Sequence, residues 1–312
     1  MQSDNIFRVI KPGALTTVQD MGRAGFQRFG VPLSGAMDMF AFQIGNILVG
    51  NPRNYASLEV TLTGPKLEAM RPVTIAITGA NLEPKINGAV KPMWATNRMN
   101  RGDILEFDKH QSGVRAYIAI AGGMDAKSHF GSKSVDMNSG FGSALEIDTV
   151  LKGYPSKVKA GIGLQKQYIP KYEKRAEVAV IEGPHTDSFT IEQRKKFFNS
   201  TFEVDANSNR MGYRLLSEKI TPKNPDIISD AVPFGGIQIP GNGQPIILMA
   251  DRQTTGGYPR IGTVISADLP KVAQLPAKGE IKFYPVSIEE AQKRLIKMEN
   301  FLTGLEVFRN YF

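Results

Sequence analysis

A dense polar loop at residues 251–259 directly follows the apolar run 245–250. Its hydrogen-bonding and charged side chains are Asp251, Arg252, Gln253, Thr254, Thr255 and Tyr258. Two glycines inside the loop let the backbone bend or approach a ligand closely. An acid, a base, amide and hydroxyl groups at a strand end favour a binding or catalytic site. We predict anion and amide recognition by Arg252, Thr254 and Thr255. Asp251 either transfers a proton or holds Arg252 in place.

A second polar cluster lies near the start of the chain, within residues 13–38. Its candidate site residues are Gln19, Asp20, Arg23, Ser34 and Asp38. An arginine fork suits a carboxylate or a phosphate, and a helix start near Ser34 favours anions. The alternative is a set of tight turns with an internal Asp20–Arg23 ion pair. We predict that both polar loops contribute to one site, with Asp20 and Asp251 as the catalytic carboxylates.

A third segment, residues 207–214, combines turn chemistry with Arg210, which we take as a further substrate-binding candidate; an ordinary loop is the alternative. Of the three histidines, His185 is the best candidate for proton transfer, although a lone histidine in a loop is more often a surface residue than a catalytic one.

Several familiar sites are missing from the sequence. Residues 131–134 lack the glycine that a phosphate-binding loop requires before its lysine, and no dinucleotide fingerprint occurs. There is no cysteine, and the histidines do not stand at metal-ligand spacing, so we predict no metal site.

The composition is that of a globular protein, with 41% hydrophobic and 22% charged residues among 312. The net charge of +8 is spread along the chain rather than interleaved with aromatics, which disfavours nucleic-acid binding. Neither a signal peptide nor a membrane span is indicated, and the absence of cysteine fits a cytoplasmic protein.

The elements that must position these loops are mainly short strands. Glycine (31) and proline (19) are scattered, and apolar runs are short and bounded by turn residues. The expected strands are 73–78, 103–107, 114–120, 177–181, 245–250 and 280–284. Regular alternation with helices is missing, so antiparallel barrels or sandwiches are favoured over a doubly wound sheet.

A few helices complete the pattern. One is expected over residues 39–49, capped by Ser34 or Asp38. Capping boxes at Thr190 and Ser287 predict a short helix to Phe198 and an amphipathic C-terminal helix. The segment 152–174 is weakly apolar and reads as a connection, which divides the chain into domains 1–165 and 166–312.

These motifs, taken in order, resemble the allophanate hydrolase subunit 2 family over residues 7–283. The segments that carry the resemblance are 16–23, 32–38, 58–65, 183–189, 208–212, 236–240 and 251–259. The family includes the KipI antagonist, the C subunit of bacterial 5-oxoprolinase and the carboxyltransferase segment of urea carboxylase. The resemblance implies two cyclophilin-like antiparallel β-barrel domains with a few short helices.

The resemblance also implies a function and partners. The leading expectation is hydrolysis of 5-oxo-L-proline to L-glutamate, driven by ATP that another subunit could bind. The implied partners are a KipI-like subunit 1 (the B subunit of 5-oxoprolinase) and a TIM-barrel-like protein (the A subunit), and the chain alone is expected to be inactive. The alternatives are a carboxyltransferase component that uses biotin with urea or an allophanate-like substrate, and a non-catalytic regulatory protein that binds the KipI-like partner.

One stretch departs from the family pattern. Ser143 stands where relatives carry an arginine, and Ile147 replaces a glycine before Asp148. If that arginine binds substrate in the family, this chain has a different substrate or little activity of its own.

Overall fold

The computed structural model describes residues 2–310, which divide by their contacts into two compact units. Among the described residues, unit 1 comprises 2–23, 38–172 and 301–310, and unit 2 comprises 24–37 and 173–300. Each unit therefore gathers segments that are distant in sequence. The division of the chain into folding domains at residue 165 stays a prediction.

Unit 1 is built from two β-sheets around one apolar core. The strands are β1 (Asp4–Lys11), β2 (Leu15–Gln19), β3 (Ser57–Thr61), β4 (Lys66–Ala69), β5 (Val73–Asn81), β6 (Pro84–Ile86), β7 (Ala89–Val90), β8 (Ala95–Met99), β9 (Ile104–Phe107), β10 (Ser112–Ile120), β11 (Met124–Asp125) and β12 (Val150–Gly153). One sheet has the order β11-β12-β1-β4-β9-β6-β7 and the other β2-β3-β10-β5-β8. Alternate residues of these strands, such as Leu58, Ile77 and Ile118, are fully buried in the core.

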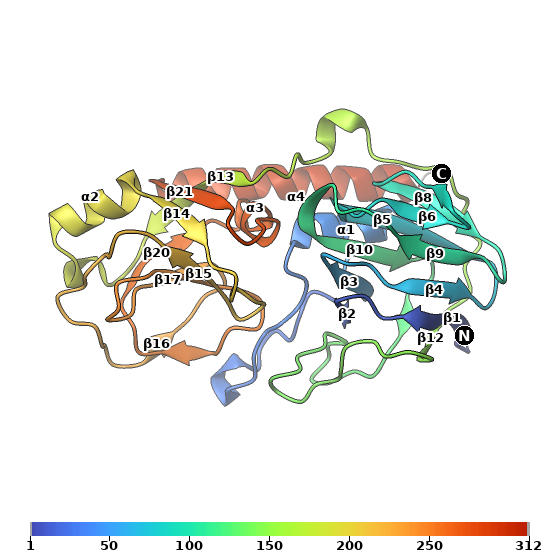
Figure 1. Ribbon diagram of the computed structural model, residues 1–312, viewed down its shortest axis with the longest axis horizontal. Helices are drawn as coiled ribbons and strands as arrows, with labels where there is room; N and C mark the ends of the chain where they lie inside the picture. Colours follow the sequence, from blue (N-terminus) through green and yellow to red (C-terminus); the bar gives the residue numbers. More distant parts are fainter. Residues whose placement is uncertain (1, 311–312) are drawn as a thin grey trace. The chain divides into compact units, whose positions relative to one another are not determined.

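Helix α1 (Met39–Leu48) packs against β5 and β10 of the five-stranded sheet (Figure 1). Of the two expected caps, Asp38 is the one used: its carboxylate accepts from the amide of Ala41 at 2.9 Å. The helix ends before Gly50, whose left-handed backbone (φ 69°) a side chain would strain. A 3-10 turn, η2 (Lys166–Tyr168), lies in the connecting segment.

Unit 2 contains a closed seven-stranded barrel, in the order β13-β20-β17-β18-β15-β14-β21. Its strands are β13 (Arg175–Glu182), β14 (Thr201–Val204), β15 (Gly212–Leu216), β17 (Gly236–Gln238), β18 (Ile246–Leu248), β20 (Arg260–Val264) and β21 (Glu280–Pro285). A small sheet pairs β16 (Asp230–Ala231) with β19 (Thr255–Gly256). The expected mainly β class with barrel closure is confirmed, but the pair β13–β21 is parallel rather than antiparallel.

Two helices that begin in unit 2, α2 and α4, follow their predicted caps. The shortest are η1 (Gln27–Phe29), η3 (Thr186–Ser188) and α3 (Leu269–Ala273). Thr190 caps α2 (Ile191–Asn199), and Ser287 caps α4 (Ile288–Asn310) by accepting from the amide of Glu290. At 23 residues, α4 is longer than the few short helices that we expected. No helix within residues 2–310 combines the length and apolar character that a membrane crossing needs.

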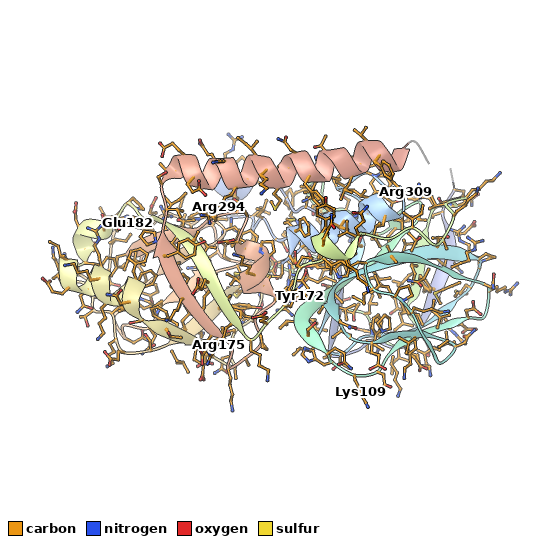
Figure 2. All side chains as sticks on the ribbon, turned by 90° about the horizontal axis from the view of Figure 1, so that it is seen from above. Lys109, Tyr172, Arg175, Glu182, Arg294 and Arg309 are labelled. Carbon is orange, nitrogen blue, oxygen red and sulfur yellow. The ribbon has the colours of Figure 1, made fainter. Side chains whose placement is uncertain are left out.

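Two arginines anchor α4: Arg294 contacts unit 2, and Arg309 contacts unit 1. Arg294, labelled in Figure 2, donates to the hydroxyl of Tyr284 on β21 at 2.8 Å. Arg309, in the last turns, donates from Nε to the carbonyl of Leu48 at the end of α1 at 3.0 Å. The second contact uses a carbonyl that helix geometry leaves without an internal partner.

Candidate functional site

The polar loop after β18 contains a buried ion pair. Asp251 accepts from Arg210 through both oxygens, with Nε–Oδ2 at 2.7 Å and Nη2–Oδ1 at 2.9 Å. The hydroxyl of Ser34 donates to Oδ1 at 2.5 Å, and Arg210 also donates to the carbonyl of Gly35. Both charged side chains are less than one-tenth exposed. The structure thus brings together three predicted site residues from three distant segments of unit 2.

This pairing corrects one expectation. Asp251 holds Arg210 rather than its chain neighbour Arg252. The chain turns directly after Ala250, and the amide of Asp251 donates to the carbonyl of Arg210, which aligns the two side chains for a bidentate contact. A carboxylate engaged in this way is suited to hold a loop, and its role in proton transfer stays a prediction.

Arg252 is a buried guanidinium without a counter-ion. Its side chain is 5% exposed, and it donates from Nε to the carbonyl of Val232 at 2.9 Å and from Nη1 to that of Met249 at 3.3 Å. Its Cζ lies 5.5 Å from the ring centre of Phe234. No acidic side chain in residues 2–310 forms an ion pair with it, and burial lowers the pKa of Arg252 to about 10.

A cavity of about 210 Å³ lies against Arg252. We call it the Arg252 pocket; its walls are Asn209, Met211, Gly212, Arg214, Gln238, Ile246, Leu248, Arg252, Gln253 and Tyr258. Thr254 and Thr255, which we expected to bind anions, are not among these residues: Thr255 is exposed on β19, and the carbonyl of Thr254 pairs with Val232. Tyr258 does line the cavity.

Sequence reasoning assigned no role to Gln238, which is 4% exposed. Its Nε2 donates to the carbonyl of Tyr258 at 3.3 Å, and no donor within residues 2–310 reaches its Oε1. The available signal was its place on β17, where one amide stands between Ile237 and Ile239 in an otherwise apolar strand.

The N-terminal polar loop builds a different arrangement in unit 1. Asp20 accepts four hydrogen bonds, from the hydroxyls of Ser132 and Ser134 (both 2.6 Å) and the amides of Lys133 (2.6 Å) and Gly22 (2.8 Å). Neutral donors thus surround the carboxylate. Asp20 therefore holds the loop 126–149 beside the edge strand β2, where Val135 also donates to the carbonyl of Val18.

Gln19 and Arg23 are likewise turned into unit 1, and both are fully buried. Gln19 donates to the carbonyl of Val135 at 3.0 Å, while its Oε1 has no partner among the described residues. Arg23 donates to the carbonyl of Ser134 and lies over the ring of Phe141, with Cζ 4.7 Å from the centre. Direct contact of either side chain with a substrate stays a prediction.

Asp38 belongs to a buried hydrogen-bond chain in unit 1. Besides capping α1, its carboxylate accepts from the hydroxyl of Tyr172 at 3.1 Å, and its amide donates to Tyr117. The Tyr117 hydroxyl donates in turn to Glu59 at 2.8 Å. Burial, together with the Glu59 carboxylate, raises the pKa of Tyr117 well above its ordinary value. Asp38 is therefore placed to fix the start of α1.

A cavity of about 490 Å³ lies in unit 1, beside Asp20. Its polar wall includes Asn54, Ser128 and Lys133, and its aromatic wall Tyr55 and Tyr154. The Lys133 ammonium donates to the carbonyl of Met124 at 2.6 Å. Asp20 and Arg252 therefore line cavities in different units, whereas Ser34 of the N-terminal cluster contacts Asp251 in unit 2. The expectation that both polar loops serve one site stays a prediction.

His185 lies at the start of η3 in unit 2. Its Nδ1 accepts from the amide of Arg260 at 3.2 Å, and its Nε2 lies 3.9 Å from the Asp230 carboxylate. Both contacts suit a residue that ties a loop to β20, and a part in proton transfer stays a prediction.

The fold places the chain in a class of mainly β proteins whose closed barrel accompanies a second, two-sheet unit. Residues 29–285 match the family described as carboxyltransferase domain, subdomain A and B. The chain belongs to this family.

Three relatives illustrate its range. The chain is 37% identical to the 5-oxoprolinase C subunit of Escherichia coli (strain K12) over 292 residues, covering 92% of this chain and 94% of that protein. It is 33% identical to urea amidolyase of Lachancea kluyveri, covering 92% of this chain but 17% of that protein. The crystal structure of the K. lactis urea amidolyase superimposes with a TM-score of 0.91 at 31% identity, over 98% of this chain and 20% of that one.

Proposed function

We propose that this chain is the C subunit of an ATP-dependent 5-oxoprolinase, which hydrolyses 5-oxo-L-proline to L-glutamate together with partner subunits. The observation that carries this proposal is the breadth of the match to the E. coli 5-oxoprolinase C subunit, at 37% identity over 94% of its length. The match to urea amidolyase, by contrast, covers only 17% of the length of that protein. The Arg252 pocket adds support, because a buried guanidinium suits the carboxylate of such a substrate.

The need for ATP follows from the substrate. A five-membered lactam is unstrained and unreactive, so coupling its hydrolysis to ATP makes the ring opening favourable. The cavity beside Asp20 in unit 1 does not fit a triphosphate, because Lys133 is the one cationic side chain that lines it and the Asp20 carboxylate also lines it. We therefore assign ATP to another protein of the complex, either the KipI-like B subunit or the TIM-barrel-like A subunit.

The test is reconstitution. The chain alone is expected to release no glutamate from 5-oxoproline and ATP, and to do so when the KipI-like and TIM-barrel-like partners are added. A matched reaction without ATP controls for contaminating hydrolase. A correctly assembled complex that releases no glutamate would refute the proposal.

A carboxyltransferase role is the second candidate, since the family match and the urea amidolyase fold favour it. It predicts transfer of a carboxyl group from carboxybiotin on a separate carrier to urea or an analogue. Loading a biotin carrier with labelled bicarbonate and following transfer in the presence of this chain distinguishes it from the first proposal.

A further inference from the structure

The charge balance around Arg252 points to a ligand. Burying a cation without a counter-ion costs several kcal/mol, and the hydrogen bonds of this guanidinium go to backbone carbonyls, with the ring of Phe234 as its other contact. The neighbouring carboxylate, Asp251, is fully committed to Arg210 and Ser34. A buried side chain of this kind does not stabilise the fold. Its positive charge is useful in a site that binds an anion.

The amides beside Arg252 add a second recognition element. Gln238 presents Oε1 as an acceptor, because its Nε2 is already used on the carbonyl of Tyr258. Gly256 makes this grouping of amides possible. A Cβ there would lie 2.7 Å from Nε2 of Gln238 and 3.3 Å from Nε2 of Gln253, so any side chain would displace both amides.

The size and lining of the pocket restrict the ligand. Pockets for drug-sized ligands occupy roughly 300–1,000 Å³, and this cavity has about 210 Å³. Met211, Ile246 and Leu248 give it an apolar part. Two cations line the pocket, the buried Arg252 and the exposed Arg214. The buried guanidinium alone balances a singly charged carboxylate in the partly apolar interior, and phosphate is the probe that shows whether both cations act on a doubly charged anion.

We propose that the Arg252 pocket binds a small carboxylate that also carries an amide or lactam. The ligand carboxylate pairs with the Arg252 guanidinium, and the ligand N–H donates to Oε1 of Gln238. This inference rests on the proposed function in one respect, because it places the lactam acid 5-oxoproline in unit 2 of this chain. Arg252 and Gln238 then contact the substrate, and Gly256 is a positioning residue.

The experiment is a titration of the full chain with small ligands. Binding is measured by calorimetry and by changes in amide chemical shifts. The probes are 5-oxo-L-proline, 2-pyrrolidinone without the carboxylate, cyclopentanecarboxylate without the amide, and inorganic phosphate. We expect 5-oxo-L-proline to bind at least about tenfold more tightly than each of the others, since one good charged or hydrogen-bonded contact is worth about 1.4 kcal/mol or more. Equal binding of 2-pyrrolidinone, or tighter binding of phosphate, would overturn the inference.

Variants locate the site. Arg252→Met is expected to weaken 5-oxo-L-proline binding at least about tenfold, with unfolding measured in parallel. Arg28→Met, an exposed arginine that stacks on Phe29 outside the pocket lining, is the matched control and should bind normally. If Arg252→Met does not fold, Gly256→Ala supplies the test, because it displaces flexible amide ends and leaves Arg252 in place. The site would be refuted if 5-oxo-L-proline bound unchanged both to Gly256→Ala and to any Arg252 variant that folds.

Assembly with the partner subunits separates this inference from the proposed function. A complex that hydrolyses 5-oxoproline with the same KM when it contains Arg252→Met refutes the site and leaves the function intact. A chain that binds 5-oxo-L-proline through Arg252, in a complex that releases no glutamate, supports the site and refutes the function.

Discussion

The two polar loops have similar compositions but handle their charge differently. In unit 1, neutral hydroxyls and amides surround the Asp20 carboxylate. In unit 2, a cation, Arg210, neutralises Asp251. Because Asp251 takes Arg210, its chain neighbour Arg252 stays without a counter-ion. The same residue types therefore yield a loop anchor in one unit and a candidate anion site in the other.

The largest effect is expected from Asp251→Asn. It keeps the shape of the side chain but leaves Arg210 as a buried unpaired charge, so the free energy of unfolding should fall by about 3–5 kcal/mol. Chemical denaturation measures this, with Glu68→Gln of the exposed pair Arg8–Glu68 as control, where a loss of at most about 1 kcal/mol is expected. If Asp251→Asn also lost at most about 1 kcal/mol of unfolding free energy, the two loops would no longer differ in how they stabilise their carboxylates.

Asp20→Ala should destabilise less, by about 1–3 kcal/mol, because it strands neutral donors rather than a charge. Hydrogen exchange should accelerate in the loop 126–149, which the carboxylate anchors. Ser139→Ala, which removes only a local hydrogen bond to Asp136, is the control on the same loop. Unchanged exchange in Asp20→Ala would contradict the anchoring role.

The pH dependence of ligand binding tests the charge of Arg252. With a pKa of about 10 in the free chain, Arg252 is protonated below that pH and binds a carboxylate. Affinity should therefore fall as the pH rises, by about twofold at pH 10 and about tenfold at pH 11. The sign for folding is opposite: the unfolded chain holds this proton more tightly, so this residue's contribution to stability increases with pH above about 10. A flat binding profile in calorimetry between pH 8 and 11 would show that Arg252 keeps its proton over this range; together with unchanged binding by Arg252→Met it would exclude Arg252 as the partner of the ligand.

The smallest effect is expected at Thr255, which lies on β19 outside the pocket lining. Thr255→Val should change stability and 5-oxo-L-proline affinity by no more than ~0.5 kcal/mol, about a factor of two. A larger loss of affinity would restore the expectation that the threonines bind the anion, and would move the site from the pocket to the loop surface.

Local patterns in the sequence predicted much of the fold. The caps at Asp38, Thr190 and Ser287 and the apolar runs of β5, β10 and β13 depend on near neighbours, and the structure confirms them. The parallel pairing of β13 with β21 joins residues such as Arg175 and Glu280, and no local pattern specifies it.

The candidate site was predictable in composition but not in its connections. Arg252 and Tyr258 were identified from their loop, and both line the pocket. The partner of Asp251 was not identified. Adjacency in sequence suggested Arg252, whereas the actual partner, Arg210, lies in the connection between β14 and β15. Gln238 was missed because a single buried amide in an apolar strand is equally compatible with a structural hydrogen bond.

The hydrogen bond between Ser34 and Asp251 has a consequence for synthesis of the chain. Its two residues are 217 positions apart, and both belong to unit 2. At about 5–20 residues per second, the segment 24–37 waits roughly 10–40 s on the ribosome before its carboxylate partner is made. Unit 2 therefore cannot complete its fold before residue 251 has been made, and its first segment stays exposed to chaperones and proteases until then.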